Sequence, residues 1–593
     1  MFFIPDYFKI KYIGIDKLRL IKSSHQYVLI MFSLLTFISC QLSNNNNKMS
    51  PPNVIFIMMD DLGYGQFGVF SDSITTADFP PFFVKLVDSL QGYSLDKSLE
   101  FSRRAMPTLK SLSENGLLFK KAYTSSSLCA PSRVGIATGS HQNKLGFYTN
   151  TDVESKGIYK GSHLVEKLKN LSYKTAHIGK WHLGRRDKTI IDTILKKHRL
   201  SNNIRWSKYR NTHPQAYNEI KNSGYIGSVI KQHNPLNNGF DYYYGYNHWA
   251  SQYYNDNNVW EDFKHVGVQK EYNTDAFTDK ALDFMEAQIG KKDPFYVQIH
   301  YHAVHDSIEP VAPKKYLDKF KSYSHHLNNF YAHINGVDQN VKRIVSFLKR
   351  NNLYENTIIV FTSDNGAMSG GVYNGHKTGS PLPGNAPFAG HKGNYYQGGI
   401  RVPLLFHWPS GIKIQGVSES LVSTMDILPS IIDLVGGTVP ENLDGRSLRP
   451  IFEQSLKETV RHNLIWAGMQ SNRWGFLITK STKHHDNEGE HAPPTWTIIE
   501  GNYLLRFTGV LEPGIYFDNM QGRKAVFELY NIKNDPGETM NILDKMPIKA
   551  MELAHAYFDK SKGFTPPQVW NKEKWLELAN SKNNLLKSEW ASP

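Results

Sequence analysis

Cysteine is scarce in this chain, whose 593 residues contain only two, Cys40 and Cys129. An intramolecular disulfide would therefore require these two distant residues to pair. The chain also has no internal repeat, and its only low-complexity segment is the asparagine run at 44–47. The composition is that of an ordinary soluble globular protein, with 40% hydrophobic and 21% charged residues, and the length corresponds to roughly two to four domains.

Motifs for nucleic-acid binding are missing as well. No zinc finger, basic zipper or RNA-recognition motif accompanies the net charge of +14 and the isoelectric point near 9.2. The charge is diffuse rather than massed in a basic arm. Of the polyanionic partners that this charge suits, a sulfated sugar is therefore favoured and nucleic acid is not expected.

An apolar stretch at 27–39 follows several basic residues and ends at Cys40. It is too short to span a bilayer comfortably, so residues 1–40 are predicted to be an export signal. Phe37-Ile38-Ser39-Cys40 resembles a bacterial lipobox, which would place a lipid on Cys40 and make 41–51 a polar tether. An uncleaved anchor and a plain secretory signal remain alternatives. The expected location is periplasmic or cell-surface, with membrane contact only through the lipid, or else secreted.

Three apolar runs end abruptly in polar residues: 53–59 before Asp60-Asp61, 295–299 before a histidine cluster, and 357–363 before Asp364-Asn365. Continuous apolar strands are typical of parallel sheets that helices cover on both faces. Ligands of such sheets bind beyond the carboxyl ends of the strands. We therefore expect the three polar clusters to meet at one edge of the sheet.

Helical and strand patterns alternate from Pro52 to about Gly437, which predicts an α/β catalytic domain with a mostly parallel sheet, placed at 52–450. One amphipathic helix is predicted over 334–348 and a shorter one over 164–171. After Leu448 the segments become short and are punctuated by glycine, as at 496–507. They predict a smaller C-terminal α+β domain over 451–593, with an antiparallel sheet and a terminal helix near 572–586.

Four side chains with oxygen ligands follow two of the predicted strands: Asp60, Asp61, Asp364 and Asn365. Three carboxylates brought together would repel one another and raise their pKa values unless a cation lay among them. Carboxylate and amide oxygens favour Ca²⁺ or Mg²⁺ over zinc, and Ca²⁺ is preferred because it tolerates irregular coordination. The alternative is that Asp364-Asn365-Gly366 forms only a turn.

The run Cys129-Ala130-Pro131-Ser132-Arg133 lies at the start of a predicted helix. A lone cysteine usually packs as a small hydrophobe, which is the alternative to a chemical role. Together with Thr138-Gly139 downstream, the run resembles the signature of type I, formylglycine-dependent sulfatases of the alkaline phosphatase-like superfamily. The resemblance implies that fold, and it implies that a maturation enzyme oxidises Cys129 to formylglycine.

Further segments resemble the same family in order along 52–541. The segment 172–184 is similar to a second signature, which implies that Lys180 binds sulfate and that His182 works beside the formylglycine. Gly390-His391-Lys392-Gly393 also matches, and the resemblance implies that Asp60, Asp61, residue 129, Asp364 and Asn365 bind the metal. The sequence departs from the family pattern at Gln397, where Glu is common, and at His302, where Asn is frequent.

Hydrolysis of a sulfate ester needs cations around the nonbridging oxygens and a proton for the leaving oxygen. The metal, Lys180 and Lys392 would supply the positive field, and hydrated formylglycine, held by Arg133, would attack sulfur. His305 would protonate the leaving oxygen, since the ordinary pKa of histidine suits a proton carrier near neutrality. His182 would then take a proton so that sulfate is expelled and the aldehyde restored.

The histidines at 300–305 also allow a zinc hydrolase, because closely spaced histidines can bind zinc. Substrate-binding candidates are His302, His391, Tyr246 and Trp249, the last two from an aromatic-rich stretch at 242–260 that can stack on sugars or simply fill the core. A basic insertion with Arg185, Arg186, Arg205 and Arg210 can contact further anionic groups of a polymer or form a solvated face. Insertions relative to the family pattern, around 69–105, 185–235 and 369–386, leave the identity of the substrate open.

The sequence thus predicts a sulfuric ester hydrolase that acts on a sulfated carbohydrate. A polysaccharide or its oligosaccharides are favoured, such as algal ulvan or carrageenan, with glycosaminoglycans open. One alternative is a phosphonate or phosphate monoester hydrolase of the same superfamily. The other is a carbohydrate-binding surface protein with a dead site.

Overall fold

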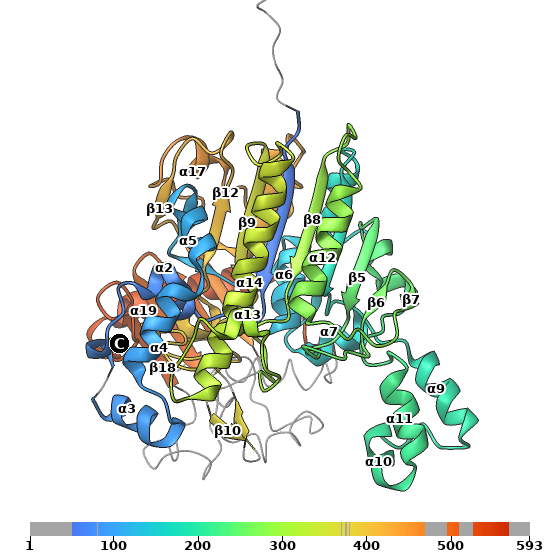
Figure 1. Ribbon diagram of the computed structural model, residues 1–593. Coiled ribbons are helices and arrows are strands. Elements are labelled where there is room, and N and C mark those ends of the chain that lie inside the picture. The colour runs from blue at the N-terminus through green and yellow to red at the C-terminus, as the bar shows by residue number, and fades with distance from the viewer. Residues whose placement is uncertain are drawn as a thin grey trace, which may run out of the picture. The chain divides into compact units, whose positions relative to one another are not determined.

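A ten-stranded sheet forms the centre of the computed structural model, in the order β13-β2-β12-β9-β1-β8-β4-β5-β6-β7 (Figure 1). The model describes residues 50–79, 81–368, 371–373, 376–378, 380–468, 495–508 and 526–568. The predicted export signal with Cys40, nearly all of the tether and the expected helix at 572–586 lie outside these residues. Within them, no helix combines the length and apolar character needed to cross a bilayer.

Five neighbouring strands in the middle of this sheet are parallel: β9 (Thr357–Ser363), β1 (Asn53–Met59), β8 (Phe295–His300), β4 (Lys174–Lys180) and β5 (Tyr242–Tyr246). Strand β12 (Leu404–His407) is antiparallel to β9, and β6 (Trp260–Glu261) is antiparallel to β5. The edges are completed by β2 (Leu117–Phe119), β13 (Gly416–Ser418) and β7 (Lys264–His265). The predicted α/β class with a mostly parallel sheet is confirmed.

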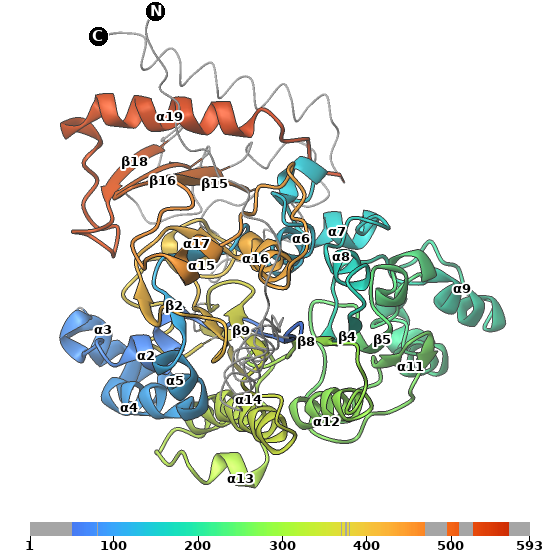
Figure 2. The same ribbon diagram turned by 90° about the horizontal axis from the view of Figure 1, so that it is seen from above.

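Alternate side chains of β1 enter two different cores, which explains why the strand is apolar throughout. Ile55, Ile57 and Met59 pack in one cluster, whereas Val54 and Phe56 pack in the other. Helices cover both faces of the sheet: α12 and α14 lie on one side and α6 and α16 on the other (Figure 2). A strand buried on both faces has no polar face to show, as expected for a parallel sheet.

The helices of the first half of the chain are α2 (Gly68–Ser71), α3 (Pro81–Leu86), α4 (Leu95–Ala105), α5 (Pro107–Glu114), α6 (Cys129–Thr138), α7 (Asn150–Lys156), α8 (Val165–Lys169), α9 (Lys188–Lys197), α10 (Tyr209–Thr212), α11 (Pro214–Asn222) and α12 (Asn273–Glu286). They are followed by α13 (Lys314–Leu317), α14 (His325–Arg350), α15 (Gln397–Ile400), α16 (Ile427–Leu434), α17 (Arg449–Glu453) and α19 (Pro547–Ser561). Short strands β3 (Ala122–Tyr123) and β14 (Val422–Ser423) pair, as do β10 (Gly371–Tyr373) and β11 (His376–Thr378).

Helix α14 contains the predicted amphipathic segment and is longer than predicted. It begins at His325 because the hydroxyl of Ser324 caps it by accepting from Leu327 N, although at a long 3.4 Å. It ends at Arg350, where Lys349 and Arg350 complement the carbonyl end of the helix dipole. The chain then turns directly into β9, so the helix fixes where that strand begins.

A separate antiparallel sheet of four strands follows: β15 (Asn463–Gly468), β16 (Thr495–Glu500), β17 (Tyr503–Thr508) and β18 (Val526–Asn531). Gly501, with a φ of +59°, allows the tight turn between β16 and β17. Helix α19 covers one face of the sheet, and Trp496 stacks on Tyr557 with ring centroids 4.2 Å apart. The predicted small sheet is confirmed, whereas α19 was not predicted; residues 51–593 group as one compact unit, so the boundary at 450 stays a prediction.

Candidate active site

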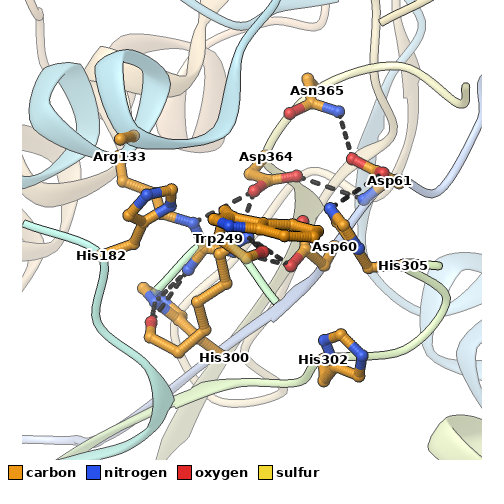
Figure 3. A network of polar contacts seen from close by, with 12 residues as sticks. Asp60, Asp61, Arg133, His182, Trp249, His300, His302, His305, Asp364 and Asn365 are labelled. Carbon is orange, nitrogen blue, oxygen red and sulfur yellow. Dashed lines mark hydrogen bonds and ion pairs between the residues drawn. The ribbon is translucent and has the colours of Figure 1, made fainter. Parts of the chain in front are cut away.

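The carboxylates predicted to meet at one sheet edge do lie together, beyond the ends of β1 and β9 (Figure 3). These strands pair in parallel with Met59 opposite Ser363, which brings the residues that follow them side by side. Asp61 N donates to Asp364 Oδ1 at 3.2 Å, and Asn365 Nδ2 donates to Asp61 Oδ1 at 2.7 Å. Asp61 adopts a φ of +62°, a conformation that aspartate tolerates better than most residues.

Three buried cations balance the three carboxylates. Lys180 Nζ lies 2.6 Å from Asp60 Oδ2, and Lys392 Nζ lies 2.8 Å from Asp61. Arg133 donates twice to Asp364 Oδ2, at 2.8 and 3.1 Å. Burial alone would raise the pKa of Asp60, but Lys180, His305 and Arg133 hold it well below its usual range. Burial and the neighbouring Asp60 raise the pKa of Asp364 despite Arg133.

Cys129 is the first residue of α6 and lies fully buried within this cluster. Ligand atoms of Asp60, Asp61, Cys129 and His305 all lie within 4.8 Å of one another. Burial raises the pKa of the Cys129 thiol to about 12, although Lys180 and Lys392 act to lower it. An unmodified thiol would therefore stay protonated and would be a weak nucleophile and metal ligand.

The cluster has the donors that a hard divalent cation prefers. Asp60 Oδ1 and Asn365 Oδ1 are buried, and neither has a hydrogen-bond partner in the described parts of the chain. Unpartnered buried oxygens are costly unless a ligand satisfies them. A set of carboxylate and amide oxygens fits Ca²⁺ or Mg²⁺. The oxygens of Asp364 are bonded by Arg133 and by Asp61 N, and those of Asp61 by Asn365 and Lys392, so a bound cation would share or replace some of these contacts.

Lys180 ends β4 and lies between the carboxylate cluster and the exposed side of the site. Its Nζ donates to the carbonyl of Trp249 at 2.7 Å as well as to Asp60. The Trp249 side chain is about half exposed, and its ring centroid lies 5.9 Å from that of His305. Tyr246 is fully buried instead, with its hydroxyl 3.2 Å from His302 Nδ1. Of these two aromatics, only Trp249 is placed to meet a sugar ring.

His182 contacts an acid that the sequence did not reveal, Glu154 of α7, with His182 Nε2 3.2 Å from Glu154 Oε1. Burial lowers the pKa of His182 to about 4, against the opposite effect of Glu154. Burial opposes ionisation of Glu154, yet His182 and Arg186 lower the pKa of Glu154 to about 2. The pair is therefore a neutral imidazole beside a carboxylate, an arrangement suited to accepting a proton.

His305 lies against the cluster, with Nε2 3.6 Å from Asp61 Oδ2 and Nδ1 2.7 Å from the carbonyl of Asp306. Burial and Lys392 lower the pKa of His305 to about 4, although Asp61 and Asp60 act to raise it. The expectation of a histidine that titrates near neutrality is therefore wrong for this environment. His305 is neutral at pH 7 until an anion beside it offsets these effects.

The three closely spaced histidines do not converge as a zinc site would require. His300 Nδ1 faces Arg133 at 3.1 Å, and His302 faces Tyr246, so within the described residues only His305 joins the candidate metal group. The sequence did not identify His300 as a site residue. Its ring and the carbonyl of Lys180 both contact Arg133 Nη1 and so fix the orientation of the guanidinium. His391 contacts the carbonyl of Lys392 and shows no contact with the cluster in the described chain.

Comparison with known proteins assigns the chain to a family. Residues 52–437 match the sulfatase family. An uncharacterized sulfatase YdeN of Escherichia coli is 30% identical over 466 residues, which cover 77% of both chains. A sulfatase of Formosa agariphila is 26% identical over 612 residues and covers 92% of this chain and 95% of its own.

Solved structures show the same fold at lower identity. Ps i-CgsB in complex with k-i-k-neocarrahexaose has a TM-score of 0.61 and 21% identity, covering 92% of this chain and 98% of its own. A phosphonate monoester hydrolase from Silicibacter pomeroyi has a TM-score of 0.50 and 15% identity, covering 87% and 96%. These likenesses concern the fold alone. The match over residues 52–437 and the relative at 30% identity show that the chain belongs to the sulfatase family and is a sulfuric ester hydrolase.

Proposed function

We propose that this sulfatase hydrolyses sulfate esters of a sulfated carbohydrate, with Cys129 converted to formylglycine and Ca²⁺ held by the carboxylate cluster. A polysaccharide or its oligosaccharides, such as carrageenan or ulvan, is the substrate class that we favour. One observation carries the proposal: a buried cysteine at a helix start lies against Asp60, Asp61 and His305, where Asp60 Oδ1 and Asn365 Oδ1 have no partner in the described chain.

Relatives that act on or bind sulfated sugars support the substrate class. The rat N-acetylgalactosamine-6-sulfatase is 28% identical over 420 residues, covering 68% of this chain and 66% of its own. Ps i-CgsB is seen with a neocarrahexaose and BT4656 with D-glucosamine-2-N,6-O-disulfate. The half-exposed Trp249 beside His305 gives this chain an aromatic face at the same place as its charged groups.

Asp60, Asp61 and Asn365 would hold the cation, with residue 129 and Asp364 completing or supporting the set. When bound, the cation supplies positive charge for the sulfate, and the formylglycine hydrate supplies the nucleophile. Lys180 and Lys392 bind the nonbridging sulfate oxygens, because their ammonium groups already point into the cluster. Arg133 uses its donors on Asp364, the carbonyl of Lys180 and His300, so it orients the cluster.

Two histidines handle protons on opposite sides of the cluster. His305 Nε2 faces the carboxylates and donates a proton to the leaving oxygen once the anionic ester beside it has raised its pKa. His182 is neutral and holds Glu154 on its Nε2 side, so it accepts a proton and Glu154 stabilises the imidazolium. Neither step needs a group from outside the described site.

Sulfate release from a panel of defined sulfated oligosaccharides tests the proposal. Wild type should release sulfate and should prefer sulfate to matched phosphate esters, chelation should abolish the activity, and Ca²⁺ should restore it. Cys129→Ala should be inactive at unchanged thermal stability. Mass spectrometry of the peptide around position 129 should show the sulfur replaced by an aldehyde oxygen after co-expression with a maturation enzyme. An unmodified thiol in active protein, or a phosphate preference, would overturn the proposal.

The location is part of the same proposal. We infer that residues 1–40 direct export and that Cys40 carries a lipid, because an apolar stretch and a lipobox-like sequence precede it. Labelled fatty acid should enter wild type and not Cys40→Ala, and the variant should leave the membrane fraction. Equal labelling of both would contradict the anchor.

A further inference from the structure

Three helices between β4 and β5 form a small unit with a hydrophobic core of its own. We call residues 185–231 the basic arm; it contains α9, α10 and α11, which lie together and apart from the helices that cover the sheet (Figure 1). Its core consists of Ile191, Ile194, Leu195, Tyr209, Ile220 and Tyr225. The arm is thus a folded element rather than a loose loop, and the positions of its charges are fixed by packing.

The basic arm concentrates the positive charge of the chain. It has eleven lysines and arginines against three aspartates and glutamates, a net charge of +8 out of +14 for all 593 residues. The expectation of a diffuse charge is therefore wrong. The insertion at 69–105 is a useful contrast, with four basic and five acidic residues. Of these two helical insertions, only the basic arm carries a large excess of positive charge.

Most of these cations are exposed and unneutralised. Lys197 pairs with Glu219 at 2.8 Å, and Arg186 pairs with Glu154 at 3.2 Å. In the described chain, the exposed cations of the arm that have no carboxylate partner are Arg185, Lys188, Lys196, Arg199, Arg205, Lys208, Arg210, Lys221 and Lys231. Like charges gathered on one small unit repel one another, so the arrangement costs folding energy unless an anion is bound there.

The basic arm is attached at the edge of the candidate active site. Arg186 shares Glu154 with His182. The side chain of Asn247, just after β5, bonds both backbone groups of Gly184 and the carbonyl of Ser228, which clamps the two ends of the arm together. Trp249 follows two residues later and its carbonyl accepts from Lys180. The base of the arm is therefore joined to the segment that carries Trp249.

We propose that the basic arm binds anionic groups on neighbouring units of a sulfated polysaccharide while one unit occupies the active site. This inference rests on the proposed function and extends it, because it makes a polymer of several sulfated units the preferred substrate over a single sulfated sugar. Many weak contacts to exposed cations add up along a polyanion and raise both the encounter rate and the local concentration of substrate. A polysaccharide is favoured over nucleic acid because the arm adjoins a site for sulfate esters.

The test compares a polymer with a small substrate in the full-length enzyme. The arm variant combines Lys196→Gln, Arg205→Gln, Lys208→Gln and Arg210→Gln. The control combines Lys85→Gln, Lys321→Gln, Lys413→Gln and Lys533→Gln, which removes the same charge from exposed positions elsewhere. A second control replaces Lys196 and Lys208 by arginine and so keeps the charge.

At low salt, kcat/KM of the arm variant on sulfated polysaccharide should fall about tenfold, since four weak exposed contacts are lost together. The loss should shrink as salt rises, because screening weakens exposed charges. Activity on a sulfated monosaccharide should stay within about twofold, because a single sugar in the active site makes no contact with the arm, and at physiological ionic strength the Debye length is only about 8 Å. Both controls should behave as wild type.

Equal losses in the arm variant and the charge-matched control, or no loss in either, would overturn the proposal. Preferential retention of nucleic acid over sulfated polysaccharide by wild type would also overturn it. If wild type hydrolyses neither substrate, the proposed function itself fails. If wild type hydrolyses both substrates and the arm variant hydrolyses the polymer as well as wild type does, only the proposed role of the arm is overturned.

Discussion

Two buried networks of charged side chains differ in how fully their polar atoms are partnered. In the cluster at the strand ends, Asp60 Oδ1 and Asn365 Oδ1 accept no hydrogen bond from the described residues. In the second network, Arg506 of β17 bonds Glu528 at 2.8 Å and also pairs with Glu538, whose other oxygen accepts from Gln397 N at 2.8 Å. The first network leaves two oxygens available for a ligand. In the second, closed network, each of the oxygens named is bonded, and the network joins the small sheet to α15.

The closed network also explains why Gln397 departs from the family pattern. Its Nε2 donates to the carbonyl of Pro536 at 3.3 Å, while its Oε1 accepts from Tyr123 and Arg401. A glutamate could not donate to Pro536 and would add a second buried carboxylate near Glu538. The amide at 397 therefore serves the contact of α15 with Pro536 and Tyr123, and the departure says little about catalysis.

Asp61→Asn should have the largest effect on activity. It removes the carboxylate that bonds Lys392 and Asn365 and that would hold the cation. We expect sulfate release to fall by at least about 10³-fold, as for the loss of a group that stabilises transition-state charge. Ca²⁺ should raise the melting temperature of wild type and leave the variant unchanged, since a ligand stabilises only the protein that binds it. A variant still stabilised by Ca²⁺ would contradict the open character of this network.

Glu538→Gln should affect stability and spare the chemistry. Arg506 is fully buried and would keep only the partly exposed Glu528 as its carboxylate partner, so we expect a loss of about 3 kcal/mol in unfolding free energy. Glu528→Gln is the matched control, with a smaller expected loss because water reaches that side chain. Chemical denaturation measures both. A large drop in kcat at unchanged stability would show that the closed network serves the reaction.

The sequence predicted where the carboxylates at the ends of β1 and β9 lie, which we call the open network, but not the residues that hold the side chains of this site in place. The runs before Asp60 and Asp364 are mostly apolar because both faces of each strand are buried, and this pattern predicted the edge of the sheet at which the polar residues lie. No sequence pattern marks Glu154 and His300 as site residues, because only the folded structure brings them into contact with His182 and Arg133. The aromatic stretch at 242–260 was expected either to stack on sugars or to fill the core. Its first five residues form β5, whose tyrosines are mostly buried, whereas Trp249 is about half exposed.

Glu154→Gln tests whether the carboxylate beside His182 contributes to proton transfer at the edge of the open network. In wild type the hydrogen bond and the charge of Glu154 raise the pKa of His182, and the variant loses the charge while its amide can still form a hydrogen bond. We expect kcat to fall about 10²-fold because the imidazole becomes a weaker base and its cation loses a partner. The acid limb of the pH profile should move to lower pH, since the base remains unprotonated further down. A profile displaced toward higher pH would contradict this role for Glu154.

Another buried carboxylate, Asp338 of α14, belongs to neither network, and its substitution has the smallest predicted effect. It accepts from Leu109 N at 2.9 Å and forms no ion pair within the described chain, and burial raises its pKa to about 6. The folded protein therefore holds a proton that the unfolded chain loses near pH 4, so stability falls as the pH rises through this window and levels off above 6. Asp338→Asn should remove that fall. Because the amide still offers one acceptor oxygen, the variant should gain about 1–2 kcal/mol over wild type at pH 7 relative to pH 4, measured by urea unfolding at both values. The same pH dependence in wild type and variant would mean that Asp338 is ionised in the folded protein although no cation is near it. Charge compensation would then not explain the difference between the two networks.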